Sequence, residues 1–173
     1  MIMKILFMGE RRIAMNCLRL LANTPKSASL ELAGIVTNDL FFNGFVKEFG
    51  EYKELPFIKN DSRNSTLILE MIKALNIDAI ISIQHNWIMP LFILDSVNGN
   101  SFNLHNAKLP DYKGYNSIFH AIANGDKTFT STIHWMAELV DSGDIIEEGV
   151  VEINQNDTAL SLYIKSVDAA TIA

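Results

Sequence analysis

The side chains best suited to chemistry lie at the end of one short predicted strand. Residues 101–105 read Ser-Phe-Asn-Leu-His, and their alternation places Asn103 and His105 on one face. An asparagine amide can donate a hydrogen bond to a developing oxyanion, and an imidazole can carry a proton near neutral pH. Open α/β sheets bind ligands at the C-terminal ends of their strands. The alternative, a polar strand end that only meets water, is not excluded by an Asn-x-His pattern alone.

A carboxylate that can complete this set follows later, in the acidic loop Glu138–Asp144. Asp141 can orient an imidazole and stabilise its charged form. An asparagine, a histidine and an aspartate together suit acyl transfer to an amine without a covalent intermediate. Their spacing in the sequence does not by itself show that they meet.

Strands and helices that alternate along the chain must position these groups. Apolar runs and alternation predict strands at residues 3–8, 30–37, 55–58, 77–83, 101–105, 129–136 and 145–153. Helical spacing and capping residues predict helices at residues 11–22, 64–75, 90–94 and 116–123, and from residue 157 onward. Residues 39–53 are predicted to be a loop with a short helix. The strand at 129–136 alternates with threonines, which is typical of a half-exposed strand. The fold class is predicted to be α/β, a Rossmann-like open, mostly parallel sheet with an antiparallel addition.

Composition sets the class of protein. The 173 residues, 49% apolar and 20% charged, predict a single globular domain over residues 1–173. A predicted helix that still runs at Ala173 indicates truncation at the C-terminus. The net charge of −6 argues against nucleic acid as a partner, and the chain lacks the apolar run of about 18 residues that a membrane span requires. The single cysteine, Cys17, favours a reducing, cytoplasmic location.

Four short motifs occur in the order and at the spacing of a known family. They are Asn103-Leu104-His105, Leu109-Pro110, Lys113-Gly114 and Val140-Asp141-Ser142-Gly143-Asp144. These motifs resemble the signature of the folate-dependent formyltransferases, and the resemblance runs from about Ile77 to Ile153. It implies the formyltransferase fold, 10-formyltetrahydrofolate as co-substrate, no metal, and catalytic roles for Asn103, His105 and Asp141.

The resemblance also implies where the folate binds. In this family the pterin ring is held largely by main-chain groups of two loops, which match residues 84–89 and 138–144 here. The residues assigned to cofactor binding are Gln84, His85, Trp87, Ile88, Met89, Leu139, Val140, Gly143 and Asp144. For Trp87 a place in the core or in a lid is an open alternative to stacking on the ligand. His134, beside Trp135 in a predicted strand, is given a structural place, and the histidines show no metal-ligand spacing.

The choice of acceptor rests on finer resemblance. Residues 104–116 and 132–136 look most like the sugar-nucleotide N-formyltransferases, which formylate the amine of a dTDP- or UDP-linked 4-amino-4,6-dideoxy sugar for surface polysaccharides. The residues then assigned to substrate binding are Arg11, Lys108, Tyr112 and Asn116. Residues 9–14 lack the glycine-serine-asparagine phosphate loop of the purine-pathway member. The chain also lacks the basic C-terminal domain of the tRNA member.

Several alternatives stay open at this point. A methionyl-tRNA formyltransferase or another formyltransferase acting on a different amine would use the same catalytic residues. A formyltetrahydrofolate hydrolase would use them with water as the nucleophile. A folate-binding domain without catalysis would not need the proton carrier. The expected partner is a small-molecule nucleotide sugar, and a homodimer is left open.

Overall fold

A computed structural model describes residues 2–25, 29–59, 65–85 and 87–172. The chain divides into two compact units, Met1–Phe102 and Asn103–Ala173. The expectation of one catalytic domain over residues 1–173 stays a prediction. Within the described residues, we find no helix with the length and apolar character that a membrane crossing requires.

The first unit is built on parallel strands in the order β3-β2-β1-β4. Its strands are β1 (Met3–Gly9), β2 (Leu30–Thr37), β3 (Phe57–Lys59) and β4 (Ala79–Ile83). Its helices are α1 (Arg11–Asn23), α2 (Asp39–Glu48), the short 3-10 helix η2 (Gly50–Tyr52), α3 (Ser65–Leu75) and α4 (Leu91–Asp95). Residues 5–8 of β1 are all buried, as expected for a parallel strand with both faces covered.

Several boundaries in this unit differ from those predicted, and the third strand, predicted at residues 55–58, is Phe57–Lys59. The fourth strand begins at Ala79 because Ile77 donates its N–H to the carbonyl of Ile72 at 3.0 Å, which closes the C-terminus of α3. Residues 39–53 are more helical than predicted. Asn38 caps α2 by accepting a hydrogen bond from the N–H of Phe41 at 2.8 Å. The predicted cap of α3 was Asn64 or Ser65; residue 64 lies outside the described residues, and Ser65 is the first residue of the helix.

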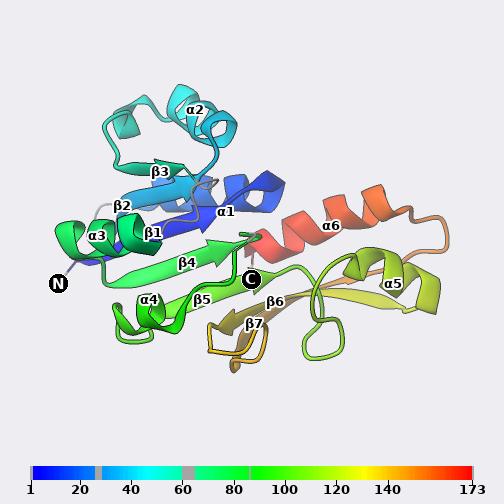
Figure 1. Ribbon diagram of the computed structural model, residues 1–173. Helices are drawn as coiled ribbons and strands as arrows, with labels where there is room; N and C mark the ends of the chain where they lie inside the picture. The colour runs from blue at the N-terminus through cyan, green and yellow to red at the C-terminus, as the bar shows by residue number, and fades with distance from the viewer. Residues whose placement is uncertain (1, 26–28, 60–64, 86, 173) are drawn as a thin grey trace. The chain divides into compact units, whose positions relative to one another are not determined.

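The second unit carries the antiparallel addition. Its elements are β5 (Ser101–His105), which begins just before the unit boundary, α5 (Ser117–Asn124), β6 (Thr128–Trp135), β7 (Ile145–Glu152) and α6 (Ala159–Ile172). β6 and β7 pair antiparallel, and α6 packs on both strands and on α5 (Figure 1, α6 in orange and red). Ala121, Phe129 and Leu162 form a small buried core there. The predicted fold class, α/β with a Rossmann-like, mostly parallel sheet and an antiparallel addition, is confirmed.

The prediction that the sixth strand is half-exposed was wrong. Thr130, Ser131 and Thr132 are all buried. The reason is that the hydroxyls of Ser131 and Thr132 bond to the turn that follows β5. Ser131 donates to Oδ1 of Asn106 at 2.6 Å, and Thr132 donates to the carbonyl of Ala107 at 2.8 Å. Polar side chains in a strand can be buried when groups of a neighbouring turn accept their hydrogen bonds.

Candidate active site

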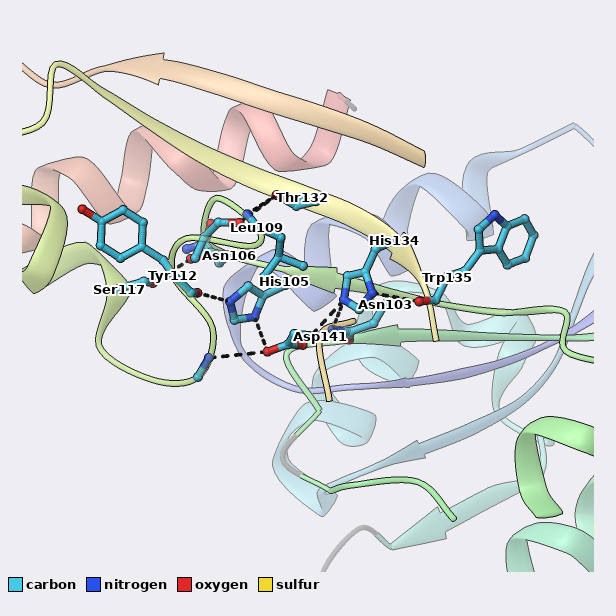
Figure 2. A network of polar contacts seen from close by, with 12 residues as sticks. Asn103, His105, Asn106, Leu109, Tyr112, Ser117, Thr132, His134, Trp135 and Asp141 are labelled. Atoms are coloured by element: carbon cyan, nitrogen blue, oxygen red, sulfur yellow. Dashed lines mark hydrogen bonds and ion pairs between the residues drawn. The ribbon is translucent and has the colours of Figure 1, made fainter. Parts of the chain in front are cut away.

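A carboxylate lies between two imidazoles in the second unit (Figure 2). Asn103 and His105 come from the end of β5, His134 comes from the end of β6, and Asp141 comes from the β6–β7 loop. Oδ2 of Asp141 is 3.7 Å from Nδ1 of His105, and its Oδ1 is 3.6 Å from Nε2 of His134. The structure therefore brings together all three residues to which catalytic roles were assigned, and it adds a second histidine.

The imidazole of His105 is held by a main-chain carbonyl. Its Nε2 lies 2.8 Å from the carbonyl oxygen of Tyr112, and since a carbonyl only accepts, Nε2 is the donor. In the neutral ring the lone pair is then on Nδ1, which faces Asp141. The N–H of Gly114 donates to Oδ2 of the same carboxylate at 3.4 Å. A proton added to the neutral ring would therefore bind to Nδ1, on the side that faces the Asp141 carboxylate.

His134 is the functional candidate that sequence reasoning missed. Its Nδ1 lies 2.9 Å from the carbonyl oxygen of Trp135, and its Nε2 lies 3.3 Å from Nδ2 of Asn103. Burial lowers the pKa of His134, although the Trp135 carbonyl and the Asp141 charge oppose this effect. One signal was present in the sequence: Thr128, Thr130, Thr132 and His134 form a polar row with a period of two.

The turn after His105 is anchored by Asn106, whose side chain is buried. Its Nδ2 donates to Oγ of Ser166 in α6 at 3.1 Å, and its Oδ1 accepts from Ser131 in β6. Its carbonyl accepts from Oγ of Ser117, the first residue of α5, at 2.9 Å. Contacts with α5, β6 and α6 therefore fix the end of β5. They also fix the backbone position from which the His105 side chain extends.

The loop that carries Asp141 lies directly against the end of β6. A Cβ atom on Gly143 would come 1.9 Å from the carbonyl oxygen of Trp135, so only glycine fits there. The N–H of Trp135 donates to the main-chain carbonyl of Asp144 at 2.9 Å. Asp141 itself has φ +51°, a left-handed conformation that aspartate and asparagine tolerate better than most residues.

The residues of this loop assigned to cofactor binding differ in exposure. Leu139 and Val140 are exposed, and Asp144 contributes its carbonyl to β6. Their assignment stays a prediction.

The other loop assigned to the cofactor, residues 84–89, belongs to the first unit. Gln84 has φ +49°, and its buried Oε1 has no hydrogen-bond partner among the described residues. Burial lowers the pKa of His85 to about 4 against the opposing charge of Glu10. The rings of His85 and Trp87 are arranged edge to face, with their centroids 6.2 Å apart. Ile88 is exposed, and Met89 is buried. The cofactor role of these residues stays a prediction.

The residues assigned to substrate binding lie in different places. Lys108 pairs with Asp111 at 2.9 Å, and the Tyr112 hydroxyl donates to Asp126. Both Lys108 and Tyr112 line a polar hollow of about 430 Å³, together with Asp111, Asn124, Asp126, Lys127 and Thr128. None of the three residues assigned to catalysis is among those that line it.

Arg11 and Asn116 both stand at the start of a helix. Arg11 is the first residue of α1 and has φ +69°. Asn116 precedes α5 with φ +61°, and its side chain makes no capping bond, contrary to prediction. The left-handed backbone of Asn116 departs from the extended conformation of an ordinary capping residue. Within the described residues, no group of three or more histidine, cysteine or acidic side chains is arranged to hold a metal ion.

Comparison with known proteins matches residues 18–173 to the family described as Formyl transferase. The bifunctional polymyxin resistance protein ArnA of Wigglesworthia glossinidia brevipalpis is 29% identical over 153 residues, which cover 88% of this chain and 23% of that protein. The methionyl-tRNA formyltransferase of Clostridioides difficile (strain 630) is 30% identical over 174 residues, which cover 96% of this chain and 55% of that protein. The chain thus spans about half, or less, of the length of these relatives.

A solved structure has the same fold. The phosphoribosylglycinamide formyltransferase from Anaplasma phagocytophilum matches with a TM-score of 0.85 at 20% sequence identity. The match covers 99% of this chain and 83% of that one.

Proposed function

We propose that this chain, which belongs to the formyl transferase family, transfers a formyl group from 10-formyltetrahydrofolate to an amine. The observation that carries the proposal is the Asp141 carboxylate beside Nδ1 of His105, with the Asn103 amide in the same network. In this set His105 can carry a proton, the Asp141 charge can stabilise the imidazolium, and Asn103 can donate a hydrogen bond to an oxyanion. Such groups serve acyl transfer directly to an amine.

The chemistry assigned to the chain is the following. As the neutral amine adds to the formyl carbon, the carbonyl π bond breaks and negative charge develops on the formyl oxygen. Asn103 donates an N–H of its amide to that oxygen. Nδ1 of His105 takes the proton released by the amine, and the Asp141 carboxylate stabilises the imidazolium that forms. The carbonyl π bond then re-forms as the carbon–nitrogen bond to the folate breaks, and His105 passes that proton to the departing folate nitrogen.

A folate donor also fits a feature of the first unit. The buried Oε1 of Gln84 is an acceptor without a partner among the described residues, and a pterin ring carries amino and N–H donors. This pairing supports the assignment of residues 84–89 to the cofactor. No metal enters the proposal.

For the acceptor, we assign the amine of a dTDP- or UDP-linked 4-amino-4,6-dideoxy sugar, in polysaccharide biosynthesis. The support is the resemblance of residues 104–116 to enzymes with such substrates, together with the net charge of −6, which disfavours an RNA backbone. The 30% identity to a methionyl-tRNA formyltransferase makes methionyl-tRNA the competing acceptor. A cytoplasmic location and a homodimer stay predictions.

The experiment incubates the full-length protein with 10-formyltetrahydrofolate and one acceptor at a time. The acceptors are a panel of dTDP- and UDP-linked 4-amino sugars, methionyl-tRNA, glycinamide ribonucleotide, and water alone. Mass spectrometry follows the formamide product, and absorbance follows the released folate. The proposal expects a formylated nucleotide sugar. Formylated methionyl-tRNA would show that methionyl-tRNA, and not an amino sugar, is the acceptor. Release of formate without any amine would favour the formyltetrahydrofolate hydrolase.

A further inference from the structure

We propose that His134 is a positioning residue of this site, whose Nε2 accepts from the Asn103 amide and thereby keeps the nitrogen end of that amide turned toward the reaction. The kinetic part of the inference rests on the proposed function, whereas its structural part does not. Three observations within the second unit carry it: the tautomer of His134, the direction of the Asn103 amide, and the separation from Asp141.

The tautomer follows from the Trp135 carbonyl. A carbonyl oxygen only accepts, so Nδ1 of His134, 2.9 Å away, carries the hydrogen. Burial lowers the pKa of this ring; the Trp135 bond and Asp141 act in the opposite direction, and His105 and Lys113 lower the pKa further. The ring is therefore neutral near pH 7, and its lone pair lies on Nε2.

That lone pair selects one orientation of the Asn103 side chain. Nδ2 of Asn103 lies 3.3 Å from Nε2 of His134, so the amide nitrogen donates to it. If the amide were turned over, its oxygen would face the lone pair, and two acceptors would oppose each other. The amide nitrogen carries two N–H bonds, of which His134 takes one. His134 thus keeps the donor end of Asn103 in the site.

Because this lone pair cannot donate a hydrogen bond, the Asp141 carboxylate remains available to His105. Oδ1 of Asp141 is 3.6 Å from Nε2 of His134, which is beyond hydrogen-bond distance. A neutral His134 offers this oxygen no proton, so it does not compete with His105 for the carboxylate. A protonated His134 would donate to Asp141 and leave Asn103 without its acceptor. The arrangement therefore requires His134 to be neutral.

Two substitutions of His134 distinguish the role of Nε2 from the role of Nδ1. His134→Gln places an amide near the position of Nε2 and can still accept from Asn103. His134→Asn reaches only the position of Nδ1, so it keeps the bond to the Trp135 carbonyl and loses the acceptor. We expect His134→Asn to lower kcat about tenfold to hundredfold, the order of cost of a misplaced reacting group, with little change in KM for the folate. His134→Gln should recover most of that loss.

A double-mutant cycle tests whether His134 affects turnover through Asn103. In an Asn103→Ala background, His134→Asn should change kcat less than about twofold, because the group that it positions is gone. Equal losses of kcat in the two backgrounds would overturn the inference, as would equal losses in the Gln and Asn variants. Thermal unfolding of each variant separates loss of the fold from loss of position.

A spectroscopic measurement tests the structural part without any turnover. Long-range ¹H–¹⁵N spectra of the parent protein near pH 7.5 should assign the His134 ring to the neutral form with hydrogen on Nδ1. A ring protonated on Nε2 would overturn the inference even if the enzyme is active. If the parent protein formylates no amine, the proposed function fails, while this spectrum still decides the place of His134.

Discussion

Nδ1 of His105 lies 3.7 Å from Oδ2 of Asp141, on the side of the ring away from the nitrogen that bonds to the Tyr112 carbonyl. The two contacts divide the work of the imidazole. One nitrogen is occupied by a main-chain acceptor that fixes the ring, and the other faces the Asp141 carboxylate. A histidine held in this way is prepared to take a proton from an amine and to pass it on.

Asp141→Asn should keep the loop and lose the chemistry. Asparagine accepts the left-handed conformation at φ +51°, whereas its amide lacks the charge that stabilises the His105 imidazolium. We expect turnover to fall about 10²-fold or more, within the range of general acid–base catalysis, with folate affinity nearly unchanged. Steady-state kinetics and folate titration measure both quantities. Glu147→Gln on exposed β7 is the control, and equal turnover in the two variants would contradict the role of Asp141.

Gly143→Ala should damage both the fold and the site. The new methyl group would lie 1.9 Å from the Trp135 carbonyl, which also holds His134, so the loop or the strand end must move. Overpacking of this kind typically costs about 1–3 kcal/mol in unfolding free energy. Urea unfolding and folate titration should both show a loss. Gly50→Ala is the matched control, because no atom lies within 4 Å of its added Cβ. A Gly143 variant as stable as this control would contradict the close approach.

The half-buried ring of His85 should make the protein less stable in acid. Its pKa is lowered by burial from 6.5 to about 4, so between these values the unfolded chain binds more protons than the folded one. The free energy of unfolding therefore falls as the pH drops from about 6.5 to about 4. His85→Gln removes this contribution, and parent and variant should diverge across that interval in favour of the variant at low pH. Urea unfolding at several pH values tests this, and a constant difference would disprove it.

The start of α6 should depend on Thr158. The N–H of Ser161 donates to the Thr158 hydroxyl at 3.1 Å, and the N–H of Thr158 donates to the Ser161 hydroxyl at 2.9 Å. This is a reciprocal cap, so Thr158→Ala should cost about 1 kcal/mol of unfolding free energy. Thr158→Ser keeps the hydroxyl and should restore most of it. Chemical denaturation of the three proteins gives the comparison, and identical midpoints would exclude the cap.

Local signals predicted the elements well. The apolar runs predicted β1 and β2, and β2 has the predicted bounds Leu30–Thr37. Capping chemistry at Asp157 and Thr158 predicted the start of α6. These features depend on neighbours in the sequence, where periodicity and capping act.

Non-local contacts explain what was missed. His134 gains its place from the carbonyl of Trp135 and from Asn103 on another strand, and the register that joins them is not encoded in local periodicity. The burial of Thr132 likewise depends on a turn 25 residues away in the chain. The resemblance of the motifs to a known family implied a common role for Asn103, His105 and Asp141, whereas their contacts required the folded second unit.

The most direct measurement of the central claim sets turnover beside folate affinity for His105→Ala. The acceptor is the amino sugar that the parent protein formylates. We predict that turnover falls by a factor of roughly 10²–10⁴, because proton transfer through Nδ1 is lost. Folate affinity should change little, because the ring acts mainly in the transition state. Near-normal turnover in a folded His105→Ala protein would contradict the role of His105 as the proton carrier.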